Sequence, residues 1–241
     1  MLPMTRTDAA PPAPASSAVG AAPRFASWAL AGALAGALGF FATILTDVHV
    51  PGDDGDRRMT VDMVDDVSIM KARLGFLAGY AVVGLLLYCA AAWRRHVEPR
   101  VPDSTAAKLV ATGFTASAGA LTLGYGWKGA MAIYGDGGPE DDSFDKEGRF
   151  VYYVLNDFGG YIGWTGVMFA AMAVAWMAFR ERSVARWIGV VSVLGLLFPV
   201  GGILVMSVPG LPGTTLPLWM IVAFSGFAFG KSPATRPLPP A

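Results

Sequence analysis

Six long apolar stretches, separated by short polar segments, occupy most of the chain from Phe25 onward. An α-helix needs about 20 residues to cross a hydrocarbon core about 30 Å thick, whereas a helix on the surface of a soluble domain carries a polar face along its whole length. The pattern therefore predicts an all-α, polytopic bundle of six transmembrane helices. The spans are expected at about 25–47, 69–93, 106–134, 150–179, 187–208 and 214–230.

The long fourth stretch permits a second interpretation. It exceeds the length that one span needs, so a break near Gly159 and Gly160 would leave residues 150–158 as an interfacial or re-entrant piece. The fifth stretch contains Pro199, which predicts a kink because proline removes one backbone donor and clashes with the preceding turn.

Composition supports the membrane assignment and narrows the classes of partner. Of the 241 residues, 54% are hydrophobic and 15% charged, and the formal net charge is zero. This is too apolar for an ordinary soluble domain, so the lipid bilayer is the expected surroundings of the chain. The basic residues form no stripe that could follow a phosphate backbone, and nucleic acid is not expected as a partner. The single cysteine, Cys89, is expected to be a small core residue.

The two ends of the chain differ from the apolar stretches. Residues 1–23 and 232–241 are rich in proline and have no apolar period. Such segments cannot bury enough apolar surface to fold. They are predicted to be disordered tails on either side of a membrane domain at 24–231.

Lysine and arginine predict the orientation, because cytoplasmic loops are enriched in them. If six helices alternate, Arg24, the turns at 94–108 and 180–186, and Lys231 all fall on one side. The loops at 48–68 and 135–149 fall on the other side and are acidic. Both termini are therefore predicted to be cytoplasmic in a multi-pass protein of the plasma membrane, with the acidic loops outside.

Ionisable residues inside the spans are costly and often mark functional sites. Lys128 and Asp157 are each expected about 10 Å below the outer ends of their helices, at about 1.5 Å per residue, where adjacent antiparallel helices could pair them. Arg73, and Asp47 with His49, belong to the same side.

Aromatic and amide groups surround these positions in the sequence. We therefore hypothesise a polar pocket that opens to the outer face and is built by the first four spans. Its expected ligand-binding residues are Arg73, Tyr125, Trp127, Lys128, Asn156, Asp157, Tyr161 and Trp164. The alternative is a structural ion pair between Lys128 and Asp157, with Arg73 extending its stem to the interface.

No metal or cofactor is expected from the sequence. His49 and Asp47 lack the further ligands that a zinc site needs. Asp53, Asp54 and Asp56 suggest a calcium loop, but arginines stand where oxygen ligands would be required. No phosphate-binding loop, hydrolase elbow or zinc-protease motif occurs.

Three classes of function remain open. The first is a binding or transport protein for an unidentified small-molecule or lipid ligand. The second is a membrane enzyme that acts on a lipid or isoprenoid-like substrate, with Asp157 or Asp47 as general acid. The third is an accessory subunit. Small-residue faces at Gly32, Gly75 and Gly159 could serve internal packing or a homo-oligomer.

Overall fold

The structure is a computed structural model that describes residues 26–50, 59–230 and 232–235. Both predicted tails therefore lie wholly or mostly outside the described residues, as do Asp53, Asp54 and Asp56. Every regular element in the described part is a helix. The predicted all-α class is confirmed.

Six helical paths are long and apolar enough to cross a membrane. The first is α1 (Ser27–Phe40), which continues as the π-helical turn η1 (Phe41–Leu45). The others are α2 (Ile69–His96), α3 (Thr105–Tyr134), α4 (Lys146–Ile162) with α5 (Thr165–Trp176) and the π-helical turn η6 (Met177–Glu181), α6 (Arg186–Met206) and α7 (Pro212–Phe229). The chain is a multi-spanning membrane protein.

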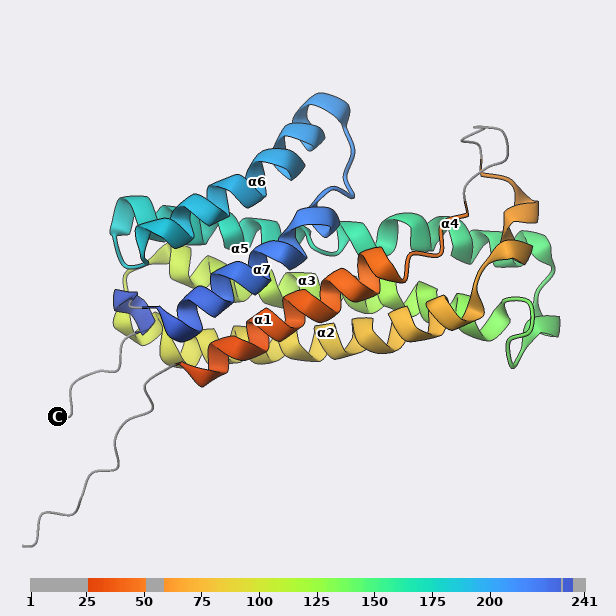
Figure 1. Cartoon of the computed structure of the whole chain (residues 1–241), viewed down its shortest axis with the longest axis horizontal. Coiled ribbons are helices and arrows are strands. Elements are labelled where there is room, and N and C mark those ends of the chain that lie inside the picture. The colour runs from red at the N-terminus through yellow and green to blue at the C-terminus, as the bar shows by residue number, and fades with distance from the viewer. Residues whose placement is uncertain (1–25, 51–58, 231, 236–241) are drawn as a thin grey trace, which may run out of the picture.

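The fourth path interrupts its helix a few residues beyond the predicted position. α4 ends at Ile162 and α5 begins at Thr165. Figure 1 shows α5 following α4 along the same side of the bundle, so no re-entrant piece forms. In the fifth path, α6 runs without interruption through Pro199.

The outward surfaces of the helices are apolar, as expected for contact with lipid. On α6, Leu194, Leu197 and Leu204 are 61%, 63% and 78% exposed. α6 leans away from the other helices toward its C-terminal end (Figure 1). A soluble protein would not leave such a contiguous apolar surface in water.

Small residues allow the helices to approach closely inside the bundle. A Cβ at Gly32 would overlap the ring of Phe224 on α7, and one at Gly159 would lie 2.9 Å from Cα of Gly124 on α3. Gly75 likewise faces the side chain of Lys128. These three small-residue faces are therefore used within one chain, so a homo-oligomer would need a different surface.

The described ends of the chain meet at one end of the bundle, where the amide of Ala26 donates to the carbonyl of Ala228 at 3.0 Å. The basic turns after α2 and η6 lie at this same end (Figure 1). This arrangement is the one that six alternating spans require. Its assignment to the cytoplasm stays a prediction from the positive-inside rule.

Several of the helical paths are longer than the hydrocarbon core is thick, about 30 Å. α3 has 30 residues and the α4–η6 path has 36, which at 1.5 Å per residue is about 45 and 54 Å. At the acidic end, which carries the loops at 59–68 and 135–149, a second apolar cluster forms. It comprises Val48, Val64, Val67, Ala72, Met131, Ala132 and Tyr153.

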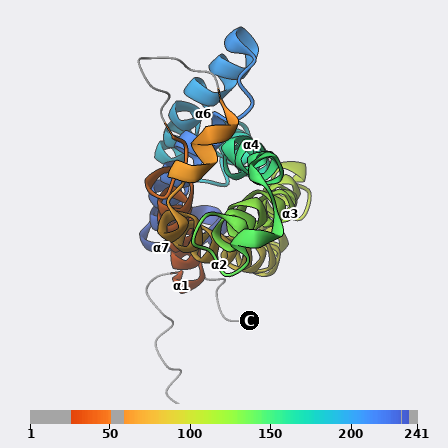
Figure 2. The ribbon, with the colours of Figure 1, turned by 90° about the vertical axis from the view of Figure 1, so that its right-hand side faces the viewer.

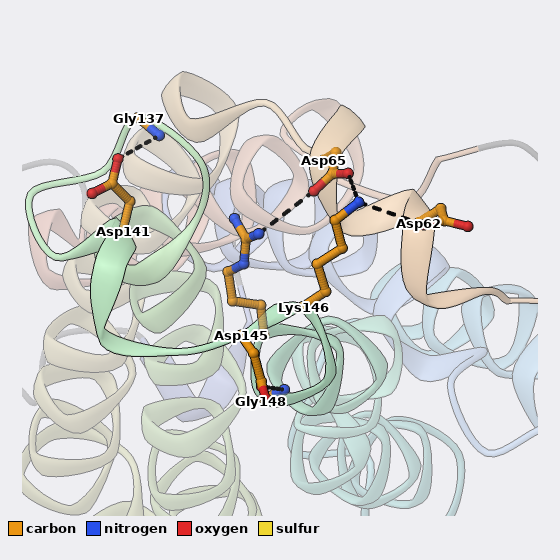
Figure 3. Close-up of polar contacts among 8 residues, drawn as sticks. Asp62, Asp65, Gly137, Asp141, Asp145, Lys146 and Gly148 are labelled. Atoms are coloured by element: carbon orange, nitrogen blue, oxygen red, sulfur yellow. Dashed lines mark hydrogen bonds and ion pairs between the residues drawn. The ribbon is translucent and has the colours of Figure 1, made fainter.

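We call this end, which the sequence predicts to lie on the outer side, the outer cap: η3 (Val61–Asp66), η5 (Asp141–Ser143), the last turn of α3 and the first turns of α4. Figure 2 looks onto it and shows η3 beside α4. Asp65 on η3 accepts from the ammonium of Lys146 (Figure 3) and lies 3.5 Å from the guanidinium of Arg149. The cap therefore rests on both apolar contacts and charge pairs.

Candidate functional site

Lys128 is the most deeply buried charged side chain in the described residues, with 3% of its surface exposed. Its Nζ donates to the backbone carbonyls of Ala42 at 2.7 Å and Thr46 at 3.0 Å. The expected pairing of Lys128 with Asp157 is therefore not formed. Gly75 on α2 explains the direction, because a Cβ there would lie 2.6 Å from Lys128 Cδ, and its absence lets the stem cross toward η1.

The π-helical turn supplies the acceptors for Lys128. The amide of Thr46 donates to Phe41 O at 3.0 Å, one residue further back than in an α-helix, where it would bond Ala42 O. Ala42 O instead accepts from Thr46 Oγ1 at 2.8 Å and from Lys128 Nζ. A side-chain ammonium thus replaces a helix hydrogen bond at the end of the first span. Such π turns are frequent at functional sites.

Four side chains form what we call the outer polar cluster: Asp47, His49, Asp157 and Tyr161. His49 Nδ1 lies 3.2 Å from Asp157 Oδ1. Asp47 accepts from the Tyr161 hydroxyl at 2.9 Å and from the His49 amide at 3.2 Å. The His49 and Asp157 side chains are 44% and 24% exposed. The cluster joins the segment after η1 to α4 and reaches the surface of the acidic end.

A buried hydroxyl network lies deeper in the bundle. Thr43 Oγ1 lies 2.8 Å from the Tyr125 hydroxyl and accepts from Trp164 Nε1 at 3.3 Å. Gly79 and Gly39 leave the space for these two rings. The polar atoms of both aromatic residues therefore have partners within the protein, which assigns Tyr125 and Trp164 to the packing around the site.

Asn156 on α4 is 4% exposed, and its Oδ1 has no hydrogen-bond partner in the described residues. The contacts of Gly159 with Gly124, and of Gly163 with Leu121, fix the antiparallel register of α3 and α4. One turn further toward the acidic end, this register brings Asn156 level with Lys128. An ammonium has three donors, of which Lys128 uses two here. The Asn156 carbonyl oxygen, which lacks a donor, and the Lys128 ammonium, which has one unused N–H, therefore lie at the same depth in the bundle.

Two of the predicted ligand-binding residues do not join this site. Arg73 is exposed and lines a groove between α2 and α3 on the outside of the bundle. Trp127 is half-buried and covers Gly159.

The sequence interpretation missed Thr43 and Thr46, because helical threonines ordinarily bond only the carbonyl four residues earlier. Thr46 does bond Ala42 O in this way. The hydroxyl of Thr43 instead joins two helices through Tyr125 and Trp164. Only the packing of the helices reveals that second role.

The charged side chains of the site have different neighbours. Asp47 directly follows Thr46, whose carbonyl accepts from the Lys128 ammonium, while the Asp157 carboxylate faces His49. No group of three His, Cys, Asp or Glu side chains in the described residues is placed to hold a metal ion. The arrangement can therefore offer a hydrogen-bonding, weakly charged environment to a ligand.

Comparison with known proteins adds no family to this description. No family model, no curated protein and no solved structure matches the chain. The fold defines its class, a multi-spanning membrane protein.

Proposed function

We propose that this protein binds a small hydroxyl-bearing ligand between Lys128 and Asn156, as a binding or transport protein whose ligand enters from the acidic side. The unpartnered Oδ1 of buried Asn156 is the observation that carries the proposal. An unsatisfied buried acceptor costs about 1–3 kcal/mol, and such groups in native proteins call for a partner. A hydroxyl group has both a donor and acceptor lone pairs, which is the chemistry that the Asn156 acceptor and the spare Lys128 donor call for.

The outer polar cluster supports entry from the acidic side. Two side-chain contacts, His49 to Asp157 and Asp47 to Tyr161, hold the segment after η1 against α4. Each is a part-exposed hydrogen bond, worth about 1 kcal/mol. This side of the site can therefore open at modest cost, whereas the opposite side is filled by Tyr125, Trp164 and the apolar core.

The enzyme hypothesis receives less support from the geometry. It needs Asp157 or Asp47 as a general acid held in an apolar site. Asp47 accepts two hydrogen bonds and Asp157 contacts His49. Both carboxyl groups are engaged in holding the segment after η1, and we do not propose that function.

Access to the site can be tested with a membrane-impermeant thiol reagent. We expect Asn156→Cys to react from the outside of intact cells much faster than the native Cys89, which is fully buried. Asn156→Cys in a Cys89→Ser background isolates the introduced thiol. An Asn156→Cys thiol that is as unreactive as Cys89 would exclude a ligand path from the acidic side.

Occupancy of the site can be tested by mass spectrometry of small molecules that co-purify with the protein. We expect a hydroxyl-bearing compound with the unsubstituted chain and its loss with Asn156→Leu. Lys108→Met, an exposed lysine on the same helix as Lys128, is a matched control that should retain it. Equal small-molecule content in folded Asn156→Leu would refute the proposal.

A further inference from the structure

The groove that contains Arg73 is separate from the site at Lys128. It lies between α2 and α3 near the acidic end and has a volume of about 590 Å³. Phe76, Leu77 and Ile133 provide apolar walls, and residues 137–139 of the loop after α3 also line it. Leu77 and Ile133 are 55% and 39% exposed, so the groove opens away from the interior of the bundle. Its chemistry combines an apolar channel with polar groups at one end.

Arg73 is exposed and has no ion-pair or hydrogen-bond partner in the described residues. It lies 20 residues before Trp93, which is buried at the basic end of α2. Twenty helical residues span about 30 Å, the thickness of the hydrocarbon core. A membrane boundary at the level of Trp93 would therefore place Arg73 at the opposite boundary, within reach of the lipid phosphates. A guanidinium binds a phosphate through two parallel hydrogen bonds.

The loop beyond the groove carries the opposite charge. Asp136 and Glu140 flank residues 137–139. The loop is folded back on itself, because the amide of Glu140 donates to Ile133 O at 3.1 Å and the amide of Gly137 donates to Asp141 Oδ2 at 3.2 Å (Figure 3). The end of the groove that residues 137–139 line therefore has an exposed acidic residue on either side of it in the chain.

We propose that this groove binds a zwitterionic phospholipid with an ammonium headgroup. The phosphate pairs with Arg73, the ammonium lies toward Asp136 and Glu140, and an acyl chain lies along Phe76 and Leu77. A lipid with a net negative headgroup gains the same contact with Arg73 but is repelled by the carboxylates of the loop. The groove therefore favours a headgroup that carries an ammonium beyond its phosphate over a headgroup that carries only the phosphate charge. This inference does not depend on the proposed ligand of Lys128.

Native mass spectrometry of the purified protein, titrated with phosphatidylethanolamine or phosphatidylglycerol of identical acyl chains, tests the proposal. We expect tighter binding of phosphatidylethanolamine. Arg73→Gln should weaken that binding about tenfold, the effect of losing one charge-assisted contact. Arg180→Gln is the matched control, because Arg180 is also exposed and lines a groove elsewhere on the bundle. It should leave the affinity unchanged.

A second variant separates headgroup selection from general lipid adhesion. Asp136→Asn with Glu140→Gln should bring the affinities of the two lipids close together while Arg73 continues to hold the phosphate. Phosphatidylglycerol binding as tightly as phosphatidylethanolamine in the unsubstituted protein would overturn the proposal. So would equal effects of Arg73→Gln and Arg180→Gln in variants whose thermal stability is unchanged.

Discussion

Replacing Lys128 with methionine tests how the buried ammonium holds the first span to the third. Methionine keeps most of the volume of the stem and removes both hydrogen bonds to η1. Ala42 O keeps one donor, Thr46 Oγ1 at 2.8 Å. Thr46 O loses its side-chain donor in a fully buried setting.

The expected loss of folding free energy follows from the Thr46 carbonyl, which is left without a side-chain donor. One orphaned buried carbonyl costs about 1–3 kcal/mol. Burial of the ammonium itself is unfavourable, and its removal offsets part of the loss. We expect a net destabilisation of about 1–2 kcal/mol, which is roughly a tenfold change in the ratio of folded to unfolded protein. Lys108→Met, at an exposed position of the same helix, should change the stability by less than about 0.5 kcal/mol.

The free energy of unfolding of the variants in detergent micelles would measure this effect. Thr46→Val alone should be mild, because Lys128 still donates to Ala42 O. The double change leaves both carbonyls without a side-chain donor and should cost about 1 kcal/mol more than the sum of the single changes. Asp157→Asn should not rescue Lys128→Met. Rescue by Asp157→Asn, or a stability of Lys128→Met equal to that of the unsubstituted protein, would refute the geometry described above.

Two further predictions concern packing and the outer cap. Gly79→Leu should lower the folded yield in detergent, because the new side chain would overlap the ring of Tyr125, at a cost of about 3 kcal/mol. Gly84→Leu is the control on the same helix and should be nearly neutral, because a Cβ at Gly84 meets nothing within 4 Å. Asp65→Asn should speed hydrogen exchange in residues 59–68 modestly, because its partner Lys146 is solvent-exposed, and the effect should decline as salt is added. Asp66→Asn is its control, and equal exchange in both variants would contradict the described ion pairs.

The sequence predicted which residues of the candidate site lie at the same end of the bundle, but it did not predict which of them are in contact. It placed Lys128, Asp157 and Asp47 near one end of the bundle, because charge and helix length can be read from the chain. It paired Lys128 with Asp157, whereas the structure directs Lys128 to backbone carbonyls of η1. No sequence signal marks a π turn, and so the freed carbonyl of Ala42 could not be foreseen.

Arg73 illustrates the same limit on the other side of α2. The chain gives its depth along the helix, which follows from 1.5 Å per residue. The direction of its side chain depends on how α2 rotates against α1 and α3. The inward positions go to Gly75 and Gly79, which admit Lys128 and Tyr125, and Arg73 therefore faces the groove between α2 and α3.

The sequence by itself determined that this is a six-span helical membrane protein, because the length and hydropathy of each span are local properties set by the thickness of the bilayer. Only the tertiary structure decided which polar groups meet. Helix rotation, the register of α3 against α4 and the π turn at the end of α1 arise from packing between segments far apart in the chain. Those three features place Lys128 beside η1, Asn156 at the same depth, and His49 against Asp157.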